Sequence, residues 1–239
     1  MKVKKKIIKK KLKKPDELIS LTEKSLTFIL RHKKKILLLG ILVVLLIGTF
    51  YLFQSWERKK EEEAAEKFHQ AVEKYQRLTS PFKEENVEEL KGLLKEFDEI
   101  RSSFPRTSPG RFSLLYKGDL HLKLNEFDEA LKAYRAFLDK AKKEKLYRFF
   151  ALEGLGYAYE GKKEFEKALE AYQEILKLEE IPQWTNLYLH MARCYEKMGK
   201  TKEALENYQT FLRLFPKSSM ANSILRKISK LEEDSFKGR

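Results

Sequence analysis

Glycine and lysine residues at positions 156–162 have the types and spacing of a phosphate-binding loop. Gly156, Gly161 and Lys162 match most of the GxxxxGK pattern, in which backbone amides between a strand and a helix cradle a phosphate group. The pattern requires a Ser or Thr after the lysine, but Lys163 follows it here. Gly156 also falls inside a predicted helix, with Gly161 in the turn after it. We therefore predict that the match is coincidental.

Residues that ligate metals or act as nucleophiles are scattered along the chain. The single cysteine, Cys194, has no activating base near it in the sequence. We therefore expect its side chain to be buried and to behave as a small apolar group. The acidic runs at 61–63 and 232–234 are typical of solvated charge. No histidine has a partner at metal-ligand spacing. We expect the four histidines to lie on the surface or in the groove without a chemical role: His32, His69, His121 and His190. We predict no catalytic residue, no metal and no cofactor, and hence no enzyme.

The elements that would position any site are three segments that repeat one another. Residues 126–134, 164–172 and 200–208 align with an alanine, a leucine and a tyrosine in register. Twelve residues before each repeated alanine, a small residue lies in another stretch with helical periodicity, so each unit is predicted to be a pair of helices. The small residues are Gly118, Gly156 and Ala192, and the repeated alanines are Ala130, Ala168 and Ala204, at spacings of 38 and 36 residues.

These units resemble tetratricopeptide repeats, slightly lengthened from the usual 34 residues. The third unit matches the family pattern best, at Tyr188, Met191, Ala192, Tyr195, Gly199, Ala204, Tyr208, Phe211 and Pro216. The resemblance implies an all-α solenoid of helical hairpins. The small residues let paired helices approach closely, and we expect Tyr134, Tyr172 and Tyr208 to fill the space between neighbouring units. Lys117 and His121 replace an apolar and an aromatic residue, so the first unit is expected to pack less well.

Further helices are predicted on both sides of the repeats. Upstream, one helix face carries Ala65, Phe68, Val72 and Tyr75, and a second helix covers Val87–Phe104 before Pro105; together they suggest a degenerate repeat. Downstream, a capping helix is predicted from the apolar stripe of Ala221, Ile224, Leu225, Ile228 and Leu231. The predicted division is membrane-proximal helices at 57–110, three repeats at 111–218, and a capping helix and tail at 219–239. No stretch is left for a catalytic domain.

The family resemblance implies a protein-binding groove lined by the first helix of each pair. The predicted groove residues are Phe112, Leu115, Asp119, Phe150, Glu153, Tyr157, Asn186, Leu189 and Arg193, with Leu122, Glu160 and Glu196 one turn further on. The Lys and Asn pattern that clamps a peptide carboxylate is missing. We therefore expect an extended or helical segment held by apolar and aromatic anchors. Alternatively, several of these residues pack against a folded-back terminal helix.

Charge is concentrated at the start of the chain. The 239 residues include 50 Lys and Arg against 36 Asp and Glu, a formal net charge of +14, and 14 of these bases but only 3 of the acids lie in the first 35 residues. The remainder is nearly balanced. A nucleic-acid-binding folded domain would carry its own basic patch, so we do not expect one here.

An uncharged apolar run of 18 residues, Ile36–Phe53, is long enough as a helix to cross a bilayer once. A buried core helix is the alternative. No small-residue cleavage site follows, so we expect a permanent anchor over 36–56, with Tyr51 and Trp56 at the far interface. Because the bases cluster before the run, the N-terminus is predicted to be cytoplasmic and the C-terminal domain periplasmic, in a bacterial inner membrane.

The basic tail at 1–35 contains a predicted short amphipathic helix, Asp16–Leu30. Nine lysines between Lys2 and Lys14 would attract it to anionic lipid. The tail could instead only set the orientation of the chain, or contact ribosomal RNA near a site of membrane insertion.

A basic tail, one membrane span and a repeat array together resemble the YfgM-type ancillary Sec-translocon subunits. This resemblance implies a periplasmic adaptor that hands emerging proteins to chaperones, with translocon subunits and chaperones as partners and no catalytic residues. The alternative is a scaffold for another envelope assembly: cytochrome maturation, outer-membrane biogenesis or a secretion system. An enzyme would require titratable groups clustered in a cleft.

Overall fold

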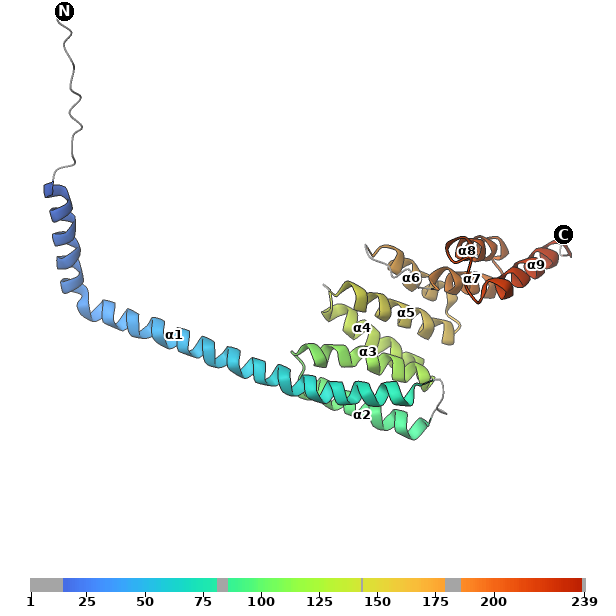
Figure 1. Ribbon diagram of the computed structural model, residues 1–239, viewed down its shortest axis with the longest axis horizontal. Coiled ribbons are helices and arrows are strands. Elements are labelled where there is room, and N and C mark those ends of the chain that lie inside the picture. The colour runs from blue at the N-terminus through green and yellow to red at the C-terminus, as the bar shows by residue number, and fades with distance from the viewer. Residues whose placement is uncertain (1–14, 81–85, 143, 179–185, 238–239) are drawn as a thin grey trace, which may run out of the picture. The chain divides into compact units, whose positions relative to one another are not determined.

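The computed structural model describes residues 15–80, 86–142, 144–178 and 186–237. All regular structure in these ranges is α-helical, which confirms the predicted all-α class (Figure 1). The chain divides into two compact units, the first ending at Arg58 and the second spanning Lys59–Arg239. The helices are α1 (Pro15–Leu78), α2 (Val87–Ser103), α3 (Ser108–Lys123), α4 (Phe127–Lys140), α5 (Lys145–Gly161), α6 (Phe165–Leu176), α7 (Leu187–Lys197), α8 (Thr201–Leu214) and α9 (Ala221–Lys237).

Helix α1 contributes residues to both units. It begins at Pro15 and includes the stretch 16–30 as its first turns, so this stretch is not a separate short helix. No glycine or second proline interrupts the chain before Gly40, which lets the helix continue. Side chains of 36–53 are exposed throughout, and the helix is long and apolar enough to cross a membrane. The alternative of a buried core helix is therefore wrong. The lysines between Lys2 and Lys14 lie outside the described residues.

The second unit is a stack of helical hairpins. Helices α3 and α4, α5 and α6, and α7 and α8 pack as pairs, and each pair packs on the next through α4 with α5 and α6 with α7 (Figure 1). Helix α2 packs on α3 at one end, and α9 packs on α8 at the other. Because each hairpin buries its apolar face only against its neighbours, the stack is a tetratricopeptide-like solenoid.

The same backbone turn closes the first helix of every pair. Asn125, Lys163 and Gly199 adopt φ angles of 58°, 62° and 72°, at the same spacings as the repeated alanines. In each turn the following amide donates to a carbonyl five residues earlier, as Glu164 N does to Tyr159 O at 2.9 Å. This is the left-handed helix ending that glycine adopts most readily. Gly161, predicted in this turn, is instead the last residue of α5.

Tyrosines fill the spaces between helices, as predicted from the repeats. Tyr134 is 4 % exposed, and a Cβ added at Gly118 in its own hairpin would lie only 2.6 Å from its ring. The ring also occupies the space beside Gly154 on the first helix of the next hairpin. Tyr134 therefore packs between neighbouring units. Tyr172 fills the space beside Gly156 in its own hairpin and stacks on His190 of the next hairpin, with ring centroids 5.5 Å apart.

Two predicted core residues are exposed. Ala64, rather than Ala65, is buried on α1, and Leu225 on α9 is 52 % exposed beside the buried Ile224. Adjacent residues on a helix point about 100° apart, so a shift of one position moves a side chain from the packed face to solvent. The first hairpin packs as a pair despite its departures from the pattern. Lys117 pairs with Asp98 on α2, and His121 Nδ1 lies 2.7 Å from Glu126 Oε2, so both polar side chains have partners.

Candidate protein-binding cavity

A cavity of about 390 Å³ opens in the second unit where α1, α3, α4 and α5 meet. Aromatic rings form most of its wall, and two carboxylates and one glycine complete it. The lining residues are Tyr75, Leu115, Tyr116, Asp119, Tyr134, Tyr147, Phe150, Glu153, Gly154 and Tyr157. A slightly larger hollow of about 410 Å³ lies between α1 and α2, but Lys74, Arg77, Glu89 and Glu96 give it the character of solvated surface.

The aromatic wall is held by ring contacts beneath it. The Tyr116 ring stacks on the Phe97 ring, with centroids 5.0 Å apart and an interplanar angle of 12°. The rings of Tyr75 and Tyr116 make an edge-to-face contact, with centroids 5.1 Å apart. Phe68 makes a further edge contact with Tyr116 at 5.5 Å. Such contacts fix ring orientation in addition to burying area. The wall is therefore formed before any ligand arrives.

The two carboxylates contact tyrosine hydroxyls. The Tyr75 hydroxyl donates to Asp119 Oδ2, and burial, followed by the charge of Asp119, raises the pKa of Tyr75 far above its ordinary value. Burial also raises the pKa of the Glu153 carboxyl, against the opposing effect of a hydrogen bond from Tyr157. The pKa of Tyr157 is raised by its own burial and then by Glu153. Both tyrosines therefore remain protonated donors at neutral pH.

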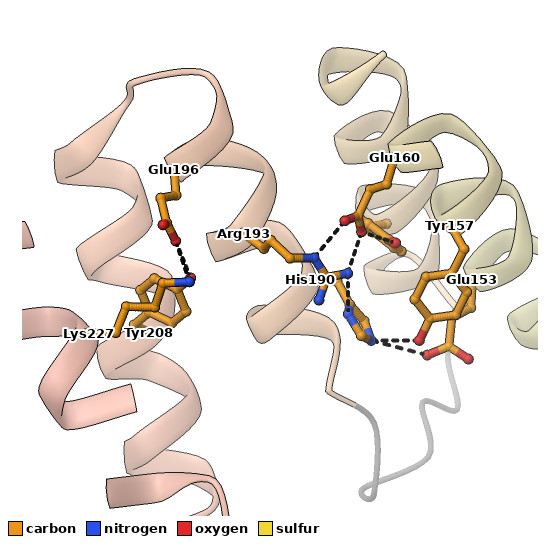
Figure 2. A network of polar contacts seen from close by, with 9 residues as sticks. Glu153, Tyr157, Glu160, His190, Arg193, Glu196, Tyr208 and Lys227 are labelled. Carbon is orange, nitrogen blue, oxygen red and sulfur yellow. Dashed lines mark hydrogen bonds and ion pairs between the residues drawn. The ribbon is translucent and has the colours of Figure 1, made fainter. Parts of the chain in front are cut away.

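A polar network joins α5 to α7 next to the cavity (Figure 2). Arg193 donates from Nε and Nη2 to the two oxygens of Glu160, each at 2.6 Å, and Tyr172 donates to the same carboxylate at 2.6 Å. Arg193 Nη2 lies 3.1 Å from His190 Nδ1, and His190 Nε2 lies 2.9 Å from the Tyr157 hydroxyl. Bidentate pairing of an arginine with a carboxylate, as between Arg193 and Glu160, is among the strongest ion pairs in proteins.

His190 is neutral within this network. Burial, and then the charge of Arg193, lower its pKa to about 4. Because Arg193 can only donate, we assign Nδ1 as the acceptor and place the ring hydrogen on Nε2. This hydrogen points to the Tyr157 hydroxyl at 2.9 Å and to the Glu153 carboxylate at 3.8 Å. His190 thus connects the ion pair to the cavity wall.

Repeat register explains why the cavity lies between the first two hairpins. Counting back 36 residues from His190 reaches Gly154, so the second hairpin has a glycine where the third has a buried histidine, and the Tyr134 ring occupies the space directly beside that glycine. The same register places Tyr157 at the position of Arg193 and, one unit earlier, Leu122 at the position of Glu160. The ion pair that links α5 to α7 therefore has no counterpart between α3 and α5.

The structure brings together five of the nine predicted groove residues. They lie on α3 and α5 at helical spacing: Leu115, Asp119, Phe150, Glu153 and Tyr157. Phe112 lies beyond the lining residues, its ring 4.3 Å from that of Tyr147.

The third hairpin departs from the expected groove. Asn186 is exposed at the start of α7, but Leu189 is 7 % exposed and packs with Ala192 and Tyr208. Arg193 is held by Glu160. Leu189 is buried because α7 packs on α8, and Arg193 is turned to the carboxylate of Glu160 on α5. Glu196 is also engaged, accepting from Tyr208 at 2.7 Å.

Several lining residues were not predicted as part of the site. Tyr75 lies far from the repeats in sequence and reaches the cavity only through the packing of α1. Tyr134 was expected as packing, and its ring also forms cavity wall. Tyr147 precedes Phe150 by one helical turn, which is the signal that could have identified it.

The other residues considered for chemistry have structural surroundings. Cys194 is fully buried, and burial raises its pKa to about 12, so its thiol is unreactive at neutral pH. His121 and His190 are buried, which corrects the expectation of surface or groove positions. Gly156 and Gly161 are helical and packed against the rings of Tyr172 and Phe127. Within the described parts of the chain, no three His, Cys, Asp or Glu side chains gather where they could hold a metal ion.

Stacked helical hairpins with a ring-lined cavity define an all-α repeat protein, a class of scaffold that presents surfaces to other proteins. Residues 27–233 match the family described as Tetratricopeptide repeat-like domain, and the chain belongs to this family. No curated protein matches the sequence.

Solved structures share the fold at low sequence identity. A tetratricopeptide repeat protein from Parabacteroides merdae ATCC 43184 is 19 % identical with a TM-score of 0.56, and the match covers 74 % of this chain and 61 % of that chain. MamA 41-end from Desulfovibrio magneticus RS-1 is 20 % identical with a TM-score of 0.52, covering 69 % and 82 %. The chain thus spans less than two thirds of the first of these structures, and the likeness concerns the fold alone.

Proposed function

We propose that this protein is a membrane-anchored adaptor that binds a segment of another protein in the cavity between α3 and α5. The observation that carries the proposal is the cavity itself, whose wall is aromatic and already formed. Tyr147, Phe150 and Tyr157 on this wall are 42 %, 41 % and 36 % exposed. Exposed aromatic side chains grouped around a hollow are typical of sites where a partner's apolar anchor is buried.

The anchor is the apolar part of α1. We propose the division predicted from the sequence: a basic tail at 1–35, a single crossing at 36–56 and the helical domain beyond it. The exposure of the apolar side chains of 36–53 supports the crossing, because a bilayer would cover apolar surface that is otherwise in contact with water. The bases preceding the span support a cytoplasmic N-terminus and a periplasmic second unit. The tail is proposed to contact anionic lipid.

The proposed partners follow from the resemblance to YfgM-type subunits. They are the Sec translocon and periplasmic chaperones, with a segment of an emerging protein as the ligand of the cavity. Tethering the cavity close to the membrane would raise its effective concentration for partners at that surface. A scaffold for another envelope assembly uses the same anchor and cavity and differs only in its partners.

Crosslinking from the cavity wall in intact bacterial cells tests this proposal. A photoreactive amino acid at Phe150 should capture proteins that the same group at Glu170, exposed on α6, does not. Recovery of translocon subunits or chaperones supports the first set of partners, and consistent recovery of other envelope components supports the alternative. Equal capture from both positions would refute the adaptor function.

Orientation is tested separately. Protease added to spheroplasts should remove the second unit while the inner membrane is intact. Cleavage only after the membrane is permeabilised would show that the second unit is cytoplasmic.

A further inference from the structure

We propose that the cavity between α3 and α5 is selective for a cationic side chain, a lysine or arginine of the bound segment. This inference rests on the proposed binding function and specifies the chemistry of the ligand. It is carried by two carboxylates in the wall, Asp119 and Glu153. A second observation is that the tyrosines equivalent to Tyr134 in the other hairpins each share a carboxylate with a lysine or an arginine.

The other two tyrosines at the repeat position of Tyr134 each lie in a set with a carboxylate and a cation. Tyr208 donates to Glu196 at 2.7 Å, and Lys227 of α9 binds that carboxylate at 2.9 Å with its Nζ 5.6 Å from the centre of the Tyr208 ring. In the neighbouring hairpin, Tyr172 and Arg193 share the carboxylate of Glu160. In both hairpins the cation comes from a later helix.

The third tyrosine of the series, Tyr134, lies beside carboxylates without such a cation. Asp119 and Glu153 line the same cavity as Tyr134, and both contribute to raising its already elevated pKa, after burial. Among the described residues, no lysine or arginine lines this cavity or pairs with either carboxylate. Nearby cations are engaged elsewhere, Lys117 with Asp98 and Arg193 with Glu160. Leu122 holds the repeat position of Glu160 and Glu196 here, so the carboxylates beside Tyr134 come from other positions of α3 and α5 and face the cavity.

The wall suits a cation with an apolar stem. Tyrosine and phenylalanine rings line the hollow, and a cation over a tyrosine face is attracted by the ring electrons, more strongly where water is excluded. Leu115 and Phe150 add apolar surface that can cover the methylene groups of a long side chain. A volume of about 390 Å³ lies in the usual range for small ligand sites. A carboxylate ligand would instead be repelled by Asp119 and Glu153.

Fluorescence anisotropy with labelled peptides tests this selectivity on the full chain in mild detergent. One probe is a short peptide with a lysine between leucine and phenylalanine; its twins carry norleucine or glutamate in place of the lysine. We expect the lysine peptide to bind on the order of tenfold more tightly than the norleucine peptide, and the glutamate peptide to bind most weakly. The norleucine twin keeps the apolar stem, so this difference measures the charge.

Variants locate the effect in the cavity. The double variant Asp119→Asn, Glu153→Gln keeps the side-chain shapes and should bind the lysine and norleucine peptides equally, whereas Glu170→Gln on α6 should retain the preference. Equal binding of both peptides to the unmodified chain would overturn cation selectivity but leave an apolar docking site and the adaptor function standing. No binding of any peptide would also overturn the selectivity, while the adaptor function would still be judged by crosslinking from Phe150.

Discussion

Acidification should destabilise the second unit through His190. The ring is held neutral by its burial and by the neighbouring charge of Arg193, which lower its pKa from 6.5 to about 4. As the pH falls through 6.5, the unfolded chain takes up a proton on this residue that the folded chain does not accept until about pH 4. Stability is therefore lost between these values, and a difference of this size corresponds to about 3 kcal/mol.

Other groups that face His190 shape the measured curve. Burial raises the pKa of Glu153, so this carboxyl contributes in the opposite direction: its effect favours the folded state at low pH and is lost as the pH rises. Arg193 stays charged throughout, and the hydroxyls of Tyr157 and Tyr172 stay protonated because burial raises their pKa values. The contribution of His190 must therefore be measured as a difference between variants.

The assay is urea unfolding of the full chain in mild detergent, followed by circular dichroism from pH 7.5 to 4.5. His190→Gln should be less stable at pH 7, by about 1 kcal/mol, because the variant weakens hydrogen bonds to Arg193 and Tyr157. It should then lose less stability on acidification than the unmodified chain, by up to about 3 kcal/mol. His69→Gln is the control, since this side chain is 77 % exposed. Parallel pH curves for the unmodified chain and His190→Gln would refute the neutral, network-bound histidine.

Three further predictions concern packing, backbone and anchor. Gly154→Ala should destabilise the fold by about 1–3 kcal/mol in urea melts, because the new methyl group meets the Tyr134 ring. Gly92→Ala, which has open space around it, should instead stabilise the fold by about 1 kcal/mol. Equal changes in stability for the two variants would contradict the assigned packing. Lys163→Gly should stabilise by about 1 kcal/mol by relieving a left-handed backbone, whereas Gly199→Ala should destabilise by a similar amount; a loss of stability in the lysine variant would count against that turn. A fragment of residues 59–239 should remain helical and monodisperse without detergent. The full chain should sediment with membranes and resist carbonate washing, because the apolar side chains of 36–53 are exposed. A freely soluble full chain would exclude the anchor.

Part of the candidate site could be predicted because it depends on helical spacing. Leu115 and Asp119 share a face of α3, and Phe150, Glu153 and Tyr157 share a face of α5, at separations of three, four and seven residues. Once the repeats align, equivalent faces of successive first helices must lie next to one another. The same reasoning failed on α7, where packing against α8 buries Leu189 and where Arg193 is held in an ion pair with Glu160 on α5.

Other features depend on contacts between residues distant in sequence. Tyr75 reaches the cavity because α1 packs near α3, and no local pattern marks it as a binding residue. His190 looked ordinary because its state is set by burial and by a cation three residues away on the helix face. Lys163 carries no signal for a left-handed backbone, although Gly199 at the equivalent position of the third unit does.

The amino-acid sequence by itself determined the helical hairpins, their number and register, and a long uncharged segment, because hydrophobic periodicity and small-residue spacing act within a few turns of chain. Only the tertiary structure decided where the stack stays open. Between α5 and α7, His190 and the pair of Glu160 and Arg193 meet across helices, whereas between α3 and α5 Gly154 admits the Tyr134 ring and the aromatic side chains around it line a cavity. That outcome depends on which side chains come within bonding distance after packing, and such distances are a property of the folded chain.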